Sequence, residues 1–519
     1  MEPYIYMEQS FFPDQKDLFC TDLPTRPLSG NVKILVTGAS GYIGGRLIHE
    51  LRARGYQVRV MVRDNAFQYQ NLWPDAEVVI ADALKYETLG TALNGIHTAF
   101  YLIHSLLLGP QGFHDADNHA AHNFMRAAEE NNVKRIIYLG GLGDVTTKLS
   151  DHLYSRIQVA DELKKGTVPV TVLRAAIIIG SGSASYEIIK HIVKKIAVIN
   201  VPRWANTRCQ PIAIRDVIKY LVGCLETPTT SGKSFDIGGK NILTYRQMME
   251  MFAVVMGKKR IFASLPFSNL RFYSYIASII TPVPAPIIHP LIEGLKNEVI
   301  CQNDSIREII PFETLTYREA VERALLREEQ DKVYTRWSDA YPKNHSLALK
   351  LHELGKLPYY TASYSIITEK SASALFESLC RVGGKGGWFQ GNWMWWLRGT
   401  VDRLLLGVGS QRGRRSDASL KINDVIDFWR VEDIRKNQRL LLRAEMKLPG
   451  RGWLEFMIMP QDDGKNKLSI TAYYDTDTLA GMLYWYIFLS LHNTIFNNLI
   501  KQIEKRSLYG DRPKRQEDL

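Results

Sequence analysis

Three glycines at a spacing of three, Gly38, Gly41 and Gly44, stand in the stretch ILVTGASGYIGGRL, residues 34–47. They follow an apolar, β-branched run and precede a helical pattern. At such a junction the backbone can approach a pyrophosphate closely, and the N–H groups and dipole of the helix favour an anion. The spacing alone is weak evidence, but the strand before it and the helix after it favour a dinucleotide site.

The residue that ends the second predicted strand indicates which dinucleotide binds. An acid about 20 residues beyond the glycine loop would accept a hydrogen bond from a ribose 2′-hydroxyl. This chain has Arg63 there, which can pair with a 2′-phosphate, so NADP is favoured and NAD is the alternative. Asp82, after the third strand, is placed to approach the adenine. The predicted cofactor-binding residues are Thr37, Gly38, Ser40, Gly41, Tyr42, Ile43, Gly44, Arg63, Asp82, Ala83, His104 and Gly140.

Short apolar runs alternate with helical stretches from residue 31 onward. The runs cover residues 33–38, 57–63, 76–82, 97–103, 135–141 and 170–179. Short apolar runs of this kind are typical of buried parallel strands, and the stretches between them are long enough for crossover helices. The sequence therefore predicts an α/β Rossmann domain with a doubly wound parallel sheet over residues 31–337, after an N-terminal arm, 1–30, that tethers or is disordered.

The pattern changes after a predicted linker at residues 338–358. A strand-like run and a Ser-capped helix are followed by long antiparallel strands within 424–476 and by a helix from about 478 to 505. We expect an α+β domain over 359–506 that can enclose an apolar cavity, and a charged tail at 507–519.

Bulk properties limit the class of protein. The net charge of +11 favours anionic ligands or surfaces without choosing among them, and five scattered cysteines without metal-ligand spacing are typical of reduced, cytoplasmic thiols. Two apolar stretches, 272–292 and 479–500, are interrupted by prolines or by His and Asn residues. We expect them to be buried or interfacial segments, with contact to a membrane surface as an option, rather than transmembrane helices.

A tryptophan-rich stretch, GGWFQGNWMWWLRG, lies in the C-terminal domain and precedes the basic run SQRGRRSD. Aromatic residues beside arginines can stack on nucleobases, but they also suit a membrane interface or the mouth of a cavity. Because no nucleic-acid-binding motif accompanies them, we predict no nucleic-acid partner and favour a hydrophobic ligand or a seam between domains.

The windows VTGASGYIGG, ADAL and RIIYLGGLG resemble the atypical and extended short-chain dehydrogenases/reductases over about residues 31–330. The likeness is greatest to the NmrA-like and complex-I-accessory-subunit-like NAD(P)-binding proteins. The segments FWRVEDI and LRAEMKLPGRGWLEF resemble a domain of unknown function that is often fused behind such domains. This resemblance implies a helix-grip architecture, START-like or polyketide-cyclase-like, over about 360–505.

The resemblance implies a Tyr-x-x-x-Lys pair that exchanges a proton while hydride moves, and a hydroxyl residue after the fifth strand. This chain has Gly140, Gly141 and Leu142 where the hydroxyl is expected, and its next helix contains DHLYSRIQ. Either His152 and Arg156 replace the pair, with His152 as a proton donor near neutral pH and Arg156 reaching the nicotinamide ribose, or Tyr154 is the phenol and Gln158 takes the lysine position. We favour the first alignment.

Three more stretches supply candidates for the substrate side. His104 and Ser105 follow the fourth strand, at the sheet edge where ligands bind in open α/β folds. The turn at Gly180–Ser185 follows another strand, and the loop with Arg203, Trp204, Arg208 and Gln210 could clamp an anionic or ring-bearing molecule.

The leading functional prediction is an NAD(P)H-dependent oxidoreductase that acts on a hydrophobic carbonyl-type substrate. The alternative is a catalytically silent dinucleotide-binding protein that senses redox state or supports assembly, with a second domain for a hydrophobic ligand.

Overall fold

The computed structural model divides the chain into two compact units, Met1–Lys343 and Asn344–Leu519. It describes residues 17–63, 69–70, 72–104, 113–143, 149–264, 269–330, 335–337, 349–383, 387–388, 392–405, 407–409, 414 and 420–507. Each unit has its own sheet and its own hydrophobic core.

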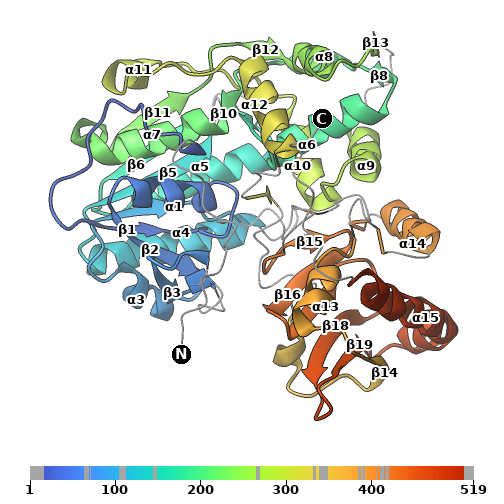
Figure 1. Ribbon diagram of the computed structural model, residues 1–519. Helices are drawn as coiled ribbons and strands as arrows, with labels where there is room; N and C mark the ends of the chain where they lie inside the picture. Colours follow the sequence, from blue (N-terminus) through green and yellow to red (C-terminus); the bar gives the residue numbers. More distant parts are fainter. Residues whose placement is uncertain are drawn as a thin grey trace, which may run out of the picture. The chain divides into compact units, whose positions relative to one another are not determined.

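A parallel sheet forms the centre of the first unit (Figure 1). Within the described ranges it has seven strands in the order β11-β6-β5-β4-β1-β2-β3, and every neighbouring pair is parallel. This order, with strands added on either side of β1, is the doubly wound Rossmann arrangement. The strands are β1 (Lys33–Val36), β2 (Gln57–Val62), β3 (Glu77–Ile80), β4 (Thr98–Tyr101), β5 (Arg135–Gly141), β6 (Val170–Ala175) and β11 (Ser234–Ile237).

Helices cover both faces of this sheet. Apolar side chains of α1 and α7 pack with strand residues such as Ile34 and Val60 on one face, and those of α3, α4 and α5 pack with residues such as Leu35 and Tyr101 on the other. The helices that follow the strands are α1 (Gly44–Ala53), α3 (Leu89–Leu93), α4 (Phe113–Glu130), α5 (Asp151–Lys164) and α7 (Ile214–Glu226).

The part of the first unit that lies past the sheet is built from short helices and paired short strands. Strands β7 and β10 and strands β8 and β13 pair in parallel, and β9 and β12 pair antiparallel. The strands are β7 (Ile178–Ile179), β8 (Val198–Asn200), β9 (Arg208–Cys209), β10 (Ile212–Ala213), β12 (Leu243–Thr244) and β13 (Ile261–Ala263). The helices are α6 (Ala184–Lys195), α8 (Tyr245–Val255), α9 (Leu270–Ile280), α10 (Ala285–Gly294), α11 (Ser305–Ile309) and α12 (Tyr317–Glu329).

The apolar stretch at residues 272–292 lies in two short helices. α9 ends before Thr281, and α10 begins after Pro284. This break is expected, because a proline disfavours helical backbone at the residue before it. No helix in the described ranges is both long enough and apolar enough to span a bilayer.

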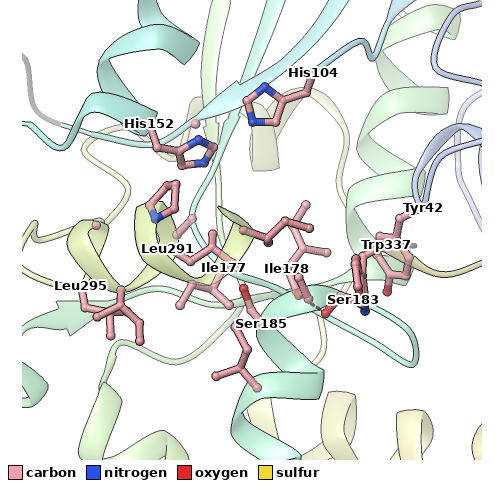
Figure 2. A pocket seen from close by; sticks show the side chains of 18 of the residues that line it. Tyr42, His104, His152, Ile177, Ile178, Ser183, Ser185, Leu291, Leu295 and Trp337 are labelled. Carbon is pink, nitrogen blue, oxygen red and sulfur yellow. Dashed lines mark hydrogen bonds between the residues drawn. The ribbon is translucent and has the colours of Figure 1, made fainter. Parts of the chain in front are cut away.

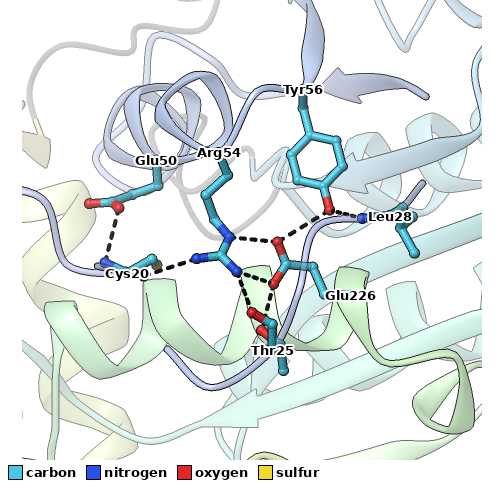
Figure 3. Close-up of polar contacts among 7 residues, drawn as sticks. All are labelled: Cys20, Thr25, Leu28, Glu50, Arg54, Tyr56 and Glu226. Atoms are coloured by element: carbon cyan, nitrogen blue, oxygen red, sulfur yellow. Dashed lines mark hydrogen bonds and ion pairs between the residues drawn. The ribbon is translucent and has the colours of Figure 1, made fainter. Parts of the chain in front are cut away.

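The described end of the N-terminal segment is docked on the first unit. Cys20 and Leu23 are buried in the core that α1 and α7 share. Figure 3 shows the polar contacts: the Arg54 guanidinium donates to the carbonyl of Cys20 (3.0 Å) and to that of Thr25 (2.6 Å), and it pairs with Glu226 from α7 (Nε to Oε1, 2.6 Å). Residues 17–28, the described part of the predicted N-terminal arm, therefore pack against this unit.

The second unit is an α+β domain around an antiparallel sheet. Within its described ranges the sheet has six strands in the order β14-β19-β18-β17-β16-β15. The strands are β14 (Tyr360–Thr368), β15 (Val425–Ile426), β16 (Trp429–Arg435), β17 (Arg439–Ala444), β18 (Arg451–Pro460) and β19 (Asn466–Asp475), and the helices are α13 (Ala372–Leu379), α14 (Asn392–Leu404) and α15 (Leu479–Arg506). The predicted strands and the final helix are confirmed, whereas α14, inside the tryptophan-rich stretch, was not predicted as a helix.

One face of this sheet and the helices enclose an aromatic core. Trp388 and Trp395 stack with ring centroids 4.5 Å apart, and Tyr474 stacks on Trp485 at 5.7 Å. Phe428 and Phe496 are buried in the same cluster. The START-like architecture and a ligand cavity in this unit stay predictions.

Candidate dinucleotide and substrate pocket

The loop between β1 and α1 has no room for side chains at two of its glycines. Gly38 has a φ of +60°, and a Cβ there would lie 2.5 Å from the carbonyl oxygen of Leu102. A Cβ on Gly44 would lie 2.4 Å from the Gly38 carbonyl oxygen, and the N–H of Gly41 donates to that same oxygen at 2.9 Å. No side chain caps the start of α1, where Ile43 is the N-cap residue. The positive end of the helix dipole at this start therefore favours an anion such as a pyrophosphate.

This loop opens into a cavity of about 890 Å³ in the first unit. Most of the predicted cofactor-binding residues line it, and they come from the ends of β1, β2, β3, β4 and β5. The lining residues among the predicted set are Gly38, Ser40, Gly41, Tyr42, Ile43, Gly44, Arg63, Asp82, Ala83, His104, Gly140, His152 and Arg156.

Thr37 is the predicted cofactor-binding residue that is not among those lining the cavity. It is fully buried, and its hydroxyl donates to the Phe100 carbonyl (3.0 Å) and accepts from the Leu102 N–H (3.0 Å). Its role in the structure is to hold the end of β1 to the end of β4. Ser105 lies outside the described residues.

Two histidines lie next to each other in the wall of the cavity (Figure 2). The ring centroids of His104 and His152 are 5.1 Å apart, and His104 Nδ1 is 2.8 Å from a carboxylate oxygen of Asp117, a buried residue of α4. Nδ1 of His152 is buried without a hydrogen-bond partner among the described residues. The pair offers a polar group inside a cavity whose walls are otherwise largely apolar.

Burial sets the charge of both histidines. It lowers the pKa of His152 well below the usual 6.5, and the nearby charges of His104 and Arg156 lower it further. Burial also lowers the pKa of His104, and the Asp117 carboxylate offsets part of that change. His152 is therefore a neutral imidazole at neutral pH, which differs from the readily protonated donor that an ordinary histidine would be.

The positions of the side chains on α5 distinguish between the two catalytic alignments that the sequence left open. His152 and Arg156 lie four residues apart on α5 and both line the cavity. Tyr154 is 51% exposed and lies outside the cavity lining, with its ring near His114, and Gln158 accepts from the amide of Asn118 on α4 (3.4 Å). The structure brings His152 and Arg156 together and leaves Tyr154 outside.

Arg156 is held against the sheet. Its guanidinium lies 4.9 Å from the centre of the Tyr138 ring and donates through Nη2 to the carbonyl of Leu139 in β5. The Tyr138 hydroxyl in turn donates to the carbonyl of Arg156 (3.1 Å). This guanidinium therefore stabilises the end of β5, next to Gly140 and Gly141.

Helices α6, α9 and α10 supply the apolar wall of the cavity, and the sequence analysis did not assign this role to them. Their side chains include Ile188, Ile192, Ile276, Ile280 and Leu291. The signal in the sequence was the apolar stretch at 272–292, which prolines interrupt too often for a membrane span and which is too apolar for a solvated surface.

The two substrate-side loops contribute only in part. In the turn at Gly180–Ser185, Ser183 caps α6 and lines the cavity together with Ala184 and Ser185. In the loop after β8, Trp204 alone of the four candidates lines the cavity. Arg203 is exposed, Arg208 pairs with Glu298 (3.0 Å), and the buried amide of Gln210 donates to the Gly239 carbonyl (2.9 Å).

A short segment, residues 335–337, crosses between the glycine loop and the turn before α6. Arg46 of α1 donates to the carbonyls of Thr335 (3.1 Å) and Ser181 (2.9 Å), and the N–H of Trp337 donates to Gly182 (2.9 Å). The Trp337 side chain lines the cavity (Figure 2). Neither Trp337 nor Asp117 was predicted as a site residue: Trp337 lies far along the chain from Gly182, and the contact of Asp117 with His104 depends on how α4 packs against the end of β4.

Comparison with known families identifies the first unit. The profile of the NmrA-like family matches residues 30–293, slightly more than half of the chain. The chain belongs to the NmrA-like family. NAD(P) binding is typical of this family of atypical short-chain dehydrogenases/reductases, and most of the residues that line the cavity described above lie within the matched part. A second family, described only as proteins of unknown function (DUF2867), matches residues 356–499.

Curated relatives are distant. The chain is 22% identical over 301 residues to "NADH dehydrogenase [ubiquinone] 1 alpha subcomplex subunit 9, mitochondrial" of Arabidopsis thaliana, which covers 54% of this chain and 75% of that protein. It is 24% identical over 261 residues to the chloroplastic divinyl chlorophyllide a 8-vinyl-reductase of Zea mays. That alignment covers 47% of this chain and 64% of the reductase. Among solved structures, Citrobacter sp. triphenylmethane reductase complexed with NADP(H) is 20% identical, with a TM-score of 0.47, and covers 56% of this chain and 99% of that one.

Proposed function

We propose that this NmrA-like protein is an NADP(H)-dependent reductase or dehydrogenase that acts on a hydrophobic carbonyl-type substrate. The observation that carries the proposal is one continuous cavity. It is lined at one part by the glycine loop and Arg63, at another by His104 and His152, and elsewhere by the apolar side chains of α6, α9 and α10.

The residues of the glycine loop suit the dinucleotide. The tight turn of this loop depends on Gly38 and Gly44, whose Cβ atoms would clash with backbone carbonyls, and the uncapped start of α1 favours the charge of a pyrophosphate. Arg63 would hold the 2′-phosphate of NADP, and Asp82 and Ala83 would lie toward the adenine. When bound, the nicotinamide supplies or accepts a hydride.

The chain's own residues then have to hold the substrate oxygen and move a proton. A neutral imidazole at His152 would donate a ring N–H to that oxygen and take up a proton at its other nitrogen as it gives one away. His104, oriented by Asp117, adjoins it, and the replacement proton would come from solvent. The apolar wall excludes water from the same space and selects a hydrophobic substrate.

A second candidate is a dinucleotide-binding protein without hydride chemistry. It is favoured by Arg156, whose guanidinium is bound to the Leu139 carbonyl and stacked on Tyr138, and by the absence of the Tyr-x-x-x-Lys pair at this helix. In that case the cavity would bind NADP(H) and the apolar molecule without a reaction between them.

The test compares two variants of α5 in the full chain. NADPH oxidation is followed with a panel of apolar aldehydes, ketones and enones, after mass spectrometry of the ligands that copurify. We expect His152→Ala to lower turnover by about a hundredfold or more while NADPH affinity is kept. Tyr154→Phe, outside the cavity, is the matched control and should retain turnover.

Two results would count against the proposed reductase. Tight NADPH binding without hydride transfer to any substrate would favour the silent binding protein. Loss of turnover in Tyr154→Phe but not in His152→Ala would show that the alignment on His152 is wrong.

A further inference from the structure

Helix α14 carries a row of exposed apolar side chains. Trp393 and Trp396 are 67% and 64% exposed, and Leu397, Val401 and Leu405 at or just beyond its end are exposed as well. The spacing of three and four residues places them on one side of the helix. Exposed tryptophans in a row are unusual on a protein that meets only water, because each leaves a large apolar surface unburied.

Helix α15 carries a second row of the same kind. Leu479, Met482, Leu483, Tyr486 and Ile487 are exposed in its first turns, while Trp485 on the opposite side is buried in the core. The helix has no charged residue from position 479 to position 500. Its exposed side is therefore apolar and neutral over several turns.

One hairpin holds both helices. The Arg398 guanidinium of α14 donates to the carbonyl of Lys447 (2.6 Å), and the Asp402 carboxylate accepts from the Lys447 N–H (2.6 Å). The hydroxyl of Thr476, just before α15, donates to the carbonyl of Pro449 in the same turn (2.8 Å). The turn between β17 and β18 thus lies between α14 and the start of α15, and Figure 1 shows both helices at the same end of this unit.

The second unit as a whole carries a net positive charge. Residues 344–519 contain 26 Lys and Arg against 19 Asp and Glu, a net charge of +7 out of +11 for the chain. Lys447 is exposed between the two helices, and Lys501 and Lys505 are exposed near the far end of α15. Asp402 is buried, and Asp475 pairs with Arg451 (3.7 Å), which leaves Asp477 as the exposed acid before α15.

We propose that the exposed faces of α14 and α15, the "α14–α15 face", dock on the surface of an anionic lipid bilayer. The apolar rows would lie at the level of the headgroups, with Trp393, Trp396 and Tyr486 in the interface that such side chains prefer. Lys447 between the two helices, and the net positive charge of the unit, would favour anionic headgroups. This inference goes beyond the proposed activity and does not depend on it.

The test is vesicle flotation of the full chain. Wild-type protein should float with vesicles of phosphatidylcholine and phosphatidylserine, less with phosphatidylcholine alone, and less at high salt. The double variant Leu483→Glu/Ile487→Glu should lower the partition coefficient by about tenfold or more. The matched control is Val254→Glu/Ile261→Glu in the first unit, which adds the same charge at side chains that are 68% and 64% exposed, and it should float nearly as well as the wild type.

Light scattering and an unfolding scan of each variant complete the test. The proposal is overturned if the wild type does not float with anionic vesicles, or if the α14–α15 variant floats as well as the control. A wild type that self-associates without binding vesicles, and a variant that is monomeric, would assign the face to a second copy of the chain. A variant that unfolds at a lower temperature, with no vesicle binding by the wild type, would assign it to packing within the chain.

Discussion

At the scale of single residues, Gly38 shows how tightly the dinucleotide loop is built. Its positive φ and the 2.5 Å between a would-be Cβ and the Leu102 carbonyl oxygen leave no place for alanine. We expect Gly38→Ala to lower the free energy of unfolding by about 1–3 kcal/mol and to weaken NADPH binding. Gly90→Ala in α3 is the control, because nothing lies within 4 Å of its would-be Cβ, and it should be neutral or slightly stabilising by urea denaturation.

Arg63 is the residue on which the choice between the two dinucleotides depends. Arg63→Asp removes a cation that would pair with the 2′-phosphate and places an acid that suits a ribose hydroxyl. We expect NADPH affinity to fall by about tenfold to a hundredfold and NADH affinity to be unchanged or higher, as measured by fluorescence titration. Wild-type protein that prefers NADH would show that Arg63 has no such role.

The residues of this site differ in how far the sequence could predict them. The glycines were predicted because their spacing follows from backbone geometry within one loop. His152 was a candidate through its position on α5, four residues before Arg156. Asp117 was missed, because its contact with His104 depends on how the start of α4 meets the end of β4, which no local pattern encodes.

At the scale of elements, the contact of residues 17–28 with α1 and α7 depends on a buried ion pair. Arg54 binds the Glu226 carboxylate through Nε and Nη2, both at 2.6 Å, and the Glu226 side chain is fully buried. Arg54→Ala would leave that carboxylate unpaired, so we expect a loss of about 3–5 kcal/mol in the free energy of unfolding and faster proteolysis near residues 17–28. The double variant Arg54→Met/Glu226→Leu should lose less, and an equal loss would contradict this account of the pair.

Elements with a regular apolar pattern were predicted well. The first six strands of the parallel sheet and the antiparallel strands of the second unit correspond to runs that the sequence marks by their apolar content. β11, with the sequence SFDI, was not predicted as a strand of the sheet, because it is short and its Asp236 is polar. That aspartate is buried beside Arg174 (2.7 Å), a pairing that only the neighbouring strand β6 supplies.

At the scale of the whole molecule, buried histidines predict how stability changes with pH. Burial lowers the pKa of His191 and of His492 to about 4, and it lowers that of His152 as well. Between these values and 6.5 the unfolded chain binds more protons than the folded one, so stability is full above about pH 6.5 and falls as the pH decreases toward 4. Each such histidine contributes at most about 1.4 kcal/mol per pH unit to the slope of the free energy of unfolding against pH.

His492→Phe tests this dependence in the second unit. His492 lies between Trp485 and Phe496, and its Nδ1 has no hydrogen-bond partner within the part of the chain that the structure describes. The variant should be at least as stable at pH 7 and should lose less stability between pH 6.5 and pH 5, as measured by urea unfolding. Equal slopes for the variant and the wild type would contradict the prediction.

The domain organisation shows what the sequence could and could not predict at this scale. The change from alternating strands and helices to successive antiparallel strands predicted a linker at residues 338–358, and the structure divides the chain between Lys343 and Asn344. The shape of the cavity could not be predicted, because its walls come from segments as distant as Gly38, Ile192, Leu291 and Trp337. Periodicity shows which side chains are apolar, but it does not show which distant apolar faces enclose the same space.

An equilibrium titration of the full chain with NADPH tests whether the glycine loop and the histidine pair belong to one NADP(H) site. Trp204 and Trp337 line the cavity, so their fluorescence should be quenched as one NADPH binds per chain. We expect saturable NADPH binding that Gly44→Val abolishes and that His152→Ala leaves intact. Absence of binding, or equal binding by wild type and Gly44→Val, would contradict it.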